Sequence, residues 1–126
     1  MARPYSDKVL DHFRQPRNRR AIAAPTVSQD GANPLCGDRI RMELRIDGDV
    51  VTDAAFTANA CAICVASASV LTELVRNAPL EDIHSFTVAD LLAQLQSDIP
   101  SARMACVKLP LTVLHTGLQL HALRAG

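Results

Sequence analysis

The chain has 126 residues, of which 48% are hydrophobic and 21% are charged, and its formal net charge is 0 at pH 7. This size and composition predict one soluble domain over residues 1–126, with enough apolar side chains to fill a core without disulfide bonds. Because a neutral chain has no overall attraction to nucleic acid or to a membrane surface, neither is expected as a partner.

The first residues of the chain, Met1 to Lys8, contain no apolar run of the kind found in signal peptides. No later segment approaches the roughly 20 consecutive apolar residues that span a bilayer. We therefore expect a cytoplasmic protein. In that reducing compartment the four cysteines are expected to bind a metal or to take part in chemistry, because disulfide bonds rarely persist there.

The first predicted element is a short helix capped by Ser6. Val9, Leu10 and Phe13 are expected to share its buried face, and the helix should end near Pro16. The arginine-rich segment after it, over residues 17–20, is polar and expected to be exposed.

A β-hairpin is predicted next. Apolar and charged residues alternate from Arg39 to Asp47, which indicates a strand with one buried and one solvent-facing side. The turn around Gly48 leads into a second strand over residues 50–57. Because the two strands run antiparallel, the segments 33–38 and 59–61 should lie at the same end of the hairpin.

Helices fill the rest of the chain. One is predicted from just after Cys61 to Asn77, and a second is opened by a capping box from Thr87 to Asp90. The last helix should begin close to Cys106, since Pro110 is best tolerated in a first turn. Thiols at helix N-termini have lowered pKa values, so both Cys61 and Cys106 are expected to form thiolates readily.

Four side chains lie beside these predicted boundaries and are interpreted as one metal site. They are Cys36, Asp38, Cys61 and Cys106. Three sulfur ligands and one carboxylate suit four-coordinate zinc or an iron–sulfur cluster. Because a carboxylate is a weaker and more exchangeable ligand for such metals than a thiolate, this set suits transient holding better than storage.

Simpler interpretations remain open for the individual residues. Each cysteine alone could be a core residue, and Asp38 alone would be expected to cap a turn. Cys64 forms a C-x-x-C pattern with Cys61, typical of a zinc knuckle or a redox pair, although helix packing is favoured for it.

Two other groups of polar residues have ordinary explanations as well. The arginines of the alternating strand are expected to face water, with partner docking as the alternative; they are Arg39, Arg41 and Arg45. The histidines show no ligand spacing and are expected to be solvated or hydrogen-bonded; they are His12, His84, His115 and His121.

A family resemblance rests on four segments. They are HFRQPRNR at 12–19, NPLCGDRI at 33–40, CAICVASAS at 61–69, and Cys106 within an apolar final helix. In their order and spacing they resemble the U-type iron–sulfur cluster assembly proteins, namely IscU, SufU and the N-terminal domain of NifU.

The resemblance implies an α+β fold, a single compact domain in which a small, mainly antiparallel sheet is covered by helices. It also implies that Cys36, Asp38, Cys61 and Cys106 converge to hold a transient cluster of the 2Fe-2S kind, or zinc. Sulfur would arrive as a persulfide from a cysteine desulfurase, and apo iron–sulfur proteins would receive the product. Cys106 is the expected persulfide acceptor, because its place at a helix start favours the thiolate and the loop before that helix could move.

The chain also departs from its relatives. Ala105 stands where IscU-type members have histidine and SufU-type members lysine, and the SufU insertion between the second and third cysteines is missing. The segment Ile99–Arg103 differs from the family's docking segment for an Hsp70 chaperone.

These observations leave two main functions in view. The favoured one is a scaffold that is not an enzyme, and the alternative is a zinc-bound sulfur acceptor, that is, a sulfurtransferase. A thiol oxidoreductase using Cys61 and Cys64 is a third possibility, and the sequence leaves open whether the chain forms a homodimer.

Overall fold

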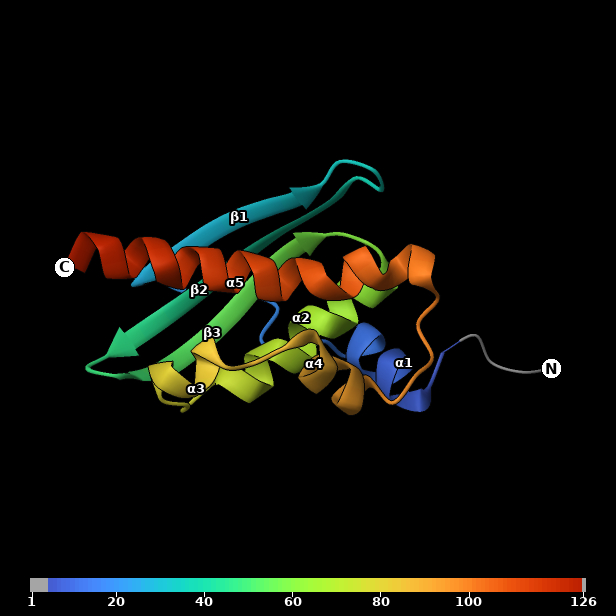
Figure 1. Ribbon diagram of the computed structural model, residues 1–126, viewed down its shortest axis with the longest axis horizontal. Helices are drawn as coiled ribbons and strands as arrows, with labels where there is room; N and C mark the ends of the chain where they lie inside the picture. The colour runs from blue at the N-terminus through green and yellow to red at the C-terminus, as the bar shows by residue number, and fades with distance from the viewer. Residues whose placement is uncertain (1–4, 126) are drawn as a thin grey trace.

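A computed structural model describes residues 5–125 and shows a three-stranded antiparallel sheet in the order β1–β2–β3, with the helices gathered on one of its faces (Figure 1). The strands are β1 (Val27–Asn33), β2 (Asp38–Asp47) and β3 (Val50–Asn59). The helices are α1 (Asp7–Arg14), α2 (Ala62–Val75), α3 (Leu80–His84), α4 (Val88–Leu95) and α5 (Met104–Ala125), and a 3₁₀ turn η1 (Ser101–Arg103) leads into α5. The predicted α+β class is confirmed.

The predicted hairpin is present as β2 and β3. Ile40, Met42 and Leu44 face the core and are at most 3% exposed, as their alternation indicates. The opposite face of β2 was predicted to be exposed to solvent along its whole length. This is wrong at Glu43, which is only 6% exposed. The backbone N–H of Ile22 donates to Glu43 Oε1 at 3.2 Å, because residues 18–23 cross this half of the outer sheet face.

We call residues 18–23 the cover segment. Its backbone joins β3 where Phe56 N–H donates to the carbonyl of Asn18 at 3.0 Å, and the carbonyl of Ala23 accepts from Arg45 on β2. The cover segment leaves the other half of the outer sheet face exposed to solvent. That half lies toward the 34–37 turn and includes Arg39, Arg41, Thr57 and Asn59.

Strand β1 was not predicted, because its sequence, VSQDGAN, has little β propensity. It pairs with β2 from Val27↔Leu44 to Asn33↔Asp38, and α5 packs against it. Glycine allows this close packing. A Cβ atom at Gly31 would overlap Val113 Cγ2 on α5, and one at Gly117 would lie 2.9 Å from Val27 Cγ1.

Helix α1 begins as predicted, with Ser6 Oγ accepting from Val9 N–H at 3.2 Å. Its predicted buried face is wrong at Phe13, which is 42% exposed, whereas His12 is 7% exposed. The helix packs on α2 through Val9 and His12, which lie three residues apart on one face, and His12 Nδ1 lies 2.7 Å from Ser69 Oγ.

The later helices follow the predictions with two exceptions. Helix α2 starts after Cys61, and the α4 capping box is formed, with Thr87 N–H donating to Asp90 Oδ2 at 2.7 Å. Helix α3 was not predicted. Pro110 is the seventh residue of α5 and not part of its first turn, since the helix starts at Met104 and η1 runs directly into it.

The hydroxyl of Ser67 on α2 donates to the carbonyl of Val107 at 2.8 Å, beside the place where the proline interrupts the α5 hydrogen-bond ladder. None of the helices within residues 5–125 is both long and apolar enough to cross a bilayer.

Candidate metal centre

The first candidate ligand, Cys36, sits on an exposed turn. Residues 34–37 connect β1 to β2, with Gly37 at φ +77° and its N–H donating to the carbonyl of Asn33 at 2.8 Å. The Asn33 side chain also accepts from the N–H of Leu35 at 3.1 Å, which fixes the turn locally. Cys36 and Leu35 therefore project from the protein, and Leu35 is 95% exposed.

Asp38 is the first residue of β2 and connects the ligand-bearing segments. Its Oδ1 accepts from the backbone N–H of Cys61 at 2.9 Å. Its Oδ2 accepts from the thiol of Cys36 at 3.1 Å and from that of Cys61 at 3.6 Å. Asp38 is 4% exposed. Burial alone would raise the pKa of its carboxyl, but the hydrogen bonds from Cys61 N–H and from the surrounding thiols outweigh burial and lower that pKa.

Cys61 is the N-cap residue of α2. Its side chain makes no capping hydrogen bond, and the first turn of α2 contains no acidic residue. The carboxylate of Asp38, reaching over from β2, supplies the negative charge that a helix N-terminus favours. Cys61 is half-buried, so its sulfur lies between the exposed turn and the core.

Cys106 approaches from the other side, as the third residue of α5. Its sulfur, the sulfur of Cys36 and a carboxylate oxygen of Asp38 all lie within 4.8 Å of one another. The prediction that its helix position lowers the pKa is wrong for this thiol. Burial, with 2% of the residue exposed, raises its pKa first, and the neighbouring Asp38 and Cys61 raise it further.

The three elements meet at one end of the molecule, at the right of Figure 1, where the β1–β2 turn and the beginnings of α2 and α5 adjoin. Among the residues that the structure describes, Cys36, Asp38 and Cys106 are the one group of three or more histidine, cysteine and acidic side chains close enough together to hold a metal ion. Cys61, the fourth predicted ligand, is not part of this group, although its Sγ lies 3.6 Å from Asp38 Oδ2.

Cys64 belongs to the core and not to this group. It is 0% exposed, one turn into α2, and burial raises its pKa, with the charges of Asp38 and Cys61 adding to the effect. The histidines also lie outside the group. His12 is hydrogen-bonded to Ser69, and His115 Nε2 lies 3.0 Å from the carbonyl of Ile83.

Arg103 is a residue at the site that sequence reasoning did not single out. Its pKa is raised by a hydrogen bond with the Cys106 side chain and by the charges of Cys61 and Tyr5. The available signal was a cation three residues before the last cysteine.

Sequence comparisons relate this chain to known proteins. The profile of the NifU-like N-terminal domain matches residues 4–125. A protein of Bacillus subtilis named zinc-dependent sulfurtransferase SufU is 39% identical over 77 residues, which cover 61% of this chain and 52% of that protein. A protein of Aquifex aeolicus named iron–sulfur cluster assembly scaffold protein IscU is 33% identical over 129 residues, which cover all of this chain and 81% of that protein.

Solved structures share the fold. The SUF-system protein FiSufU of Fervidobacterium islandicum superimposes with a TM-score of 0.77 at 22% identity, covering 90% of this chain and 96% of that one. A NifU-like N-terminal protein of Brucella abortus superimposes with a TM-score of 0.76 at 21% identity, covering 92% of each chain.

Proposed function

This chain belongs to the NifU-like N-terminal domain family, and from that premise we propose that it is an iron–sulfur cluster assembly scaffold. It would take sulfur from a cysteine desulfurase and pass a transient cluster to apo iron–sulfur proteins. The observation that carries the proposal is the Asp38 carboxylate, which lies 3.1 Å from the thiol of Cys36 and 3.6 Å from that of Cys61.

The ligand set consists of Cys36, Asp38, Cys61 and Cys106. Thiols and a carboxylate fit iron and zinc, which accept sulfur and oxygen ligands in tetrahedral sites. The two oxygens of Asp38 have separate tasks. Oδ1 remains bonded to the N–H of Cys61, while Oδ2 is freed when the thiols lose their protons, and it then faces the cargo. An ionised Asp38 is ready for this, since its pKa is lowered.

Sulfur transfer would use a thiolate of this chain as the nucleophile. We propose Cys106 for this step, because Arg103 hydrogen-bonds to its sulfur and stabilises the anion. The thiolate would attack the terminal sulfur of the donor's persulfide. The new S–S bond forms on Cys106, the old one breaks, and the donor's cysteine leaves as a thiolate. Metal coordination removes the thiol proton outright, which offsets the raised pKa of the metal-free thiol.

A second function, a zinc-dependent sulfurtransferase, is supported by one specific observation, the 39% identity with the Bacillus protein of that name. The same four residues would hold one zinc ion, and one cysteine would leave it to accept sulfur. In the scaffold function the chain carries cargo and is not an enzyme, whereas in this one it takes part in catalysis. Both functions suit the cytoplasm, where the four free cysteines would stay reduced.

Metal and acid-labile sulfide analysis of protein purified without oxygen tests the proposal. The scaffold should contain iron and sulfide in similar amounts after incubation with a desulfurase, cysteine and ferrous iron. Zinc alone, held through that incubation without sulfide, would favour the sulfurtransferase. Cys64→Ser is the matched control, because it removes a thiol that lies one helical turn away but is buried in the core.

A further inference from the structure

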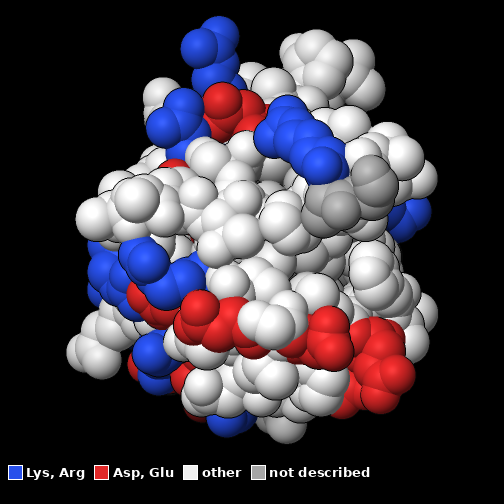
Figure 2. All heavy atoms as spheres, turned by 90° about the vertical axis from the view of Figure 1, so that its left-hand side faces the viewer, with Lys and Arg blue, Asp and Glu red and all other residues white. Residues whose placement is uncertain are grey.

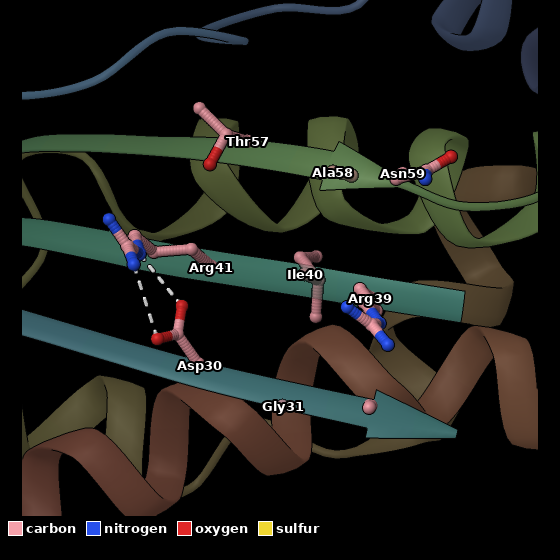
Figure 3. A pocket seen from close by; sticks show the side chains of 9 residues that line it. Asp30, Gly31, Arg39, Ile40, Arg41, Thr57, Ala58 and Asn59 are labelled. Atoms are coloured by element: carbon pink, nitrogen blue, oxygen red, sulfur yellow. Dashed lines mark hydrogen bonds and ion pairs between the residues drawn. The ribbon is translucent and has the colours of Figure 1, made fainter. Parts of the chain in front are cut away.

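The uncovered half of the outer sheet face forms a groove of about 610 Å³ beside the candidate metal centre. Its side chains come from three strands, with Asp30 on β1, Arg39 and Arg41 on β2, and Thr57 and Asn59 on β3 (Figure 3). The groove ends where β2 begins. The arginine at that end is Arg39, which follows Asp38 in the sequence. Asp38 itself points to the opposite, helix-covered face, so a molecule lying in the groove would end beside the 34–37 turn that carries the exposed Cys36.

The groove carries an excess of positive charge. Arg41 is paired with Asp30, with Nε to Oδ1 at 2.7 Å and Nη2 to Oδ2 at 3.3 Å (Figure 3). Arg39 is exposed and has no hydrogen bond or ion pair among the described residues. Arg19, at the edge of the cover segment, points its guanidinium to the carbonyl of Ala58, which also lines the groove.

This charge is local, since the chain as a whole has a formal net charge of 0. Figure 2 shows the end of the molecule away from the 34–37 turn, where a band of acidic side chains crosses the surface. A bound partner responds mainly to the nearby side chains, so the groove can attract negative charge despite the overall balance.

The spacing of the arginines indicates the shape of the occupant. Arg39 and Arg41 stand two residues apart on one strand, so their Cα atoms are roughly 6.8 Å apart on the same face. Carboxylates at alternate positions of an extended peptide have the same spacing. Thr57 and Asn59, paired in register with these arginines, add hydrogen-bonding groups for a backbone.

We propose that this groove binds an extended acidic segment of a protein partner and brings that partner beside the turn that carries Cys36. The assignment of the partner as a sulfur donor or cluster acceptor rests on the proposed function, but the binding itself does not. Nucleic acid fits less well, because no aromatic side chain lines the groove for base stacking.

Two synthetic peptides of equal composition test the proposal with the metal-free protein. One has glutamate alternating with threonine over seven residues, and the other has its glutamates in one block. In NMR titrations at low salt, the alternating peptide should bind at least about threefold more tightly and shift the Arg39 and Arg41 signals. Arg39→Glu should weaken its binding roughly tenfold, because an attraction becomes a repulsion. Arg39→Gln should give a smaller loss.

The matched control is Arg124→Glu, the same charge change on an exposed residue near the end of α5. Equal weakening by both variants, or equal affinity for the two peptides, would overturn the proposal. If an oligouridylate binds more tightly than the alternating peptide, and Arg39→Glu abolishes that binding, the groove would be assigned to nucleic acid instead. Cys36→Ser separates this proposal from the proposed function, since it removes a metal ligand but should leave peptide affinity unchanged.

Discussion

Cys36 and Cys106 contribute to one group of side chains from opposite structural settings. Cys36 lies on an exposed turn held by hydrogen bonds to Asn33, and its neighbour Leu35 contacts almost nothing. Cys106 is 2% exposed and lies in a helix that packs on β1, β2 and α2. One side of the site is accessible and the other is fixed by the core.

This difference suits a protein that must both hold and release its cargo. The buried side keeps its geometry because close-packed side chains resist displacement. The exposed side can exchange ligands with a partner at little cost in packing, since few contacts are lost when the turn moves. Asp38 stands between them, with one oxygen bonded to the backbone of α2 and the other facing the turn.

The largest effect is expected from removing single ligands. Cys106→Ser, Cys61→Ser and Cys36→Ser should each lower metal affinity by about 100-fold or more, because hydroxyl oxygen is a poor ligand for these metals. Cys64→Ser should retain most binding. Metal content and absorbance of the four variants measure this. If Cys64→Ser is as damaging as Cys61→Ser while Cys36→Ser is harmless, the site is a C-x-x-C site.

The buried side can be disturbed without touching a ligand. Gly31→Ala places a Cβ atom against Val113 on α5, so the helix must shift or the strand must bend. We expect a loss of about 1–3 kcal/mol in the free energy of unfolding, typical of overpacking. Denaturant titration measures it, with Gly37→Asn as a control, since no atom lies within 4 Å of a Cβ there and asparagine tolerates the φ of +77° better than most side chains.

The comparison of the two thiols can be tested directly by alkylation. In metal-free protein Cys36 should react roughly tenfold or more faster than Cys106, because it is exposed whereas burial raises the pKa of Cys106.

In metal-loaded protein treated with a desulfurase and cysteine, mass spectrometry should locate the added sulfur on Cys106. Sulfur found only on Cys36 or Cys64 would refute Cys106 as the acceptor.

Asp38 can be varied to test release. Asp38→Ala removes the exchangeable oxygen ligand, so a cluster assembled on the variant should be retained longer under a chelator and transferred roughly threefold more slowly to apo-ferredoxin. A single zinc ion should instead be lost faster, since its fourth ligand is gone. Asp38→Asn is the control, because its amide oxygen can still accept from Cys61 N–H. A variant that holds iron and sulfide less well than wild type would contradict the scaffold mechanism.

The smallest expected effect is a loss of stability at mildly acidic pH. Burial lowers the pKa of His12, with Arg17 adding to the decrease, so the unfolded chain binds a proton more readily than the folded one. The folded state is therefore fully favoured above the ordinary histidine pKa of about 6.5 and should lose stability as pH falls below it. Thermal unfolding of wild type and His12→Gln between neutral and mildly acidic pH should show a shallower decline for the variant. Identical declines would exclude His12 as the cause.

The features that depend on local sequence were predictable. Ser6, the Thr87–Asp90 capping box and the alternation in β2 each contain their own physical signal within a few residues. The relation of Cys36 to Cys61 followed from the antiparallel hairpin, which brings residues 33–38 and 59–61 together.

The missed features depend on distant partners. Strand β1 exists because β2 supplies its hydrogen bonds and because Gly31 admits α5, and neither is visible in its own residues. Glu43 is buried by the cover segment, and the pKa of Cys106 is set by burial and by Asp38 from another element. The position of Pro110 inside α5 depends on the preceding 3₁₀ turn.

Pro110 also has a consequence for motion. A proline has no amide hydrogen, so the carbonyl of Cys106 receives no bond from it, and the first six residues of α5 are connected to the rest by a weakened ladder. The segment is held instead by its packing, because Cys106 and Val107 are at most 2% exposed and the hydroxyl of Ser67 donates to the carbonyl of Val107 at 2.8 Å. The place of Cys106 in the site therefore depends on the packing of α5 against α2 more than on the helix ladder, so a change in that packing would move this ligand while the rest of α5 stays in place.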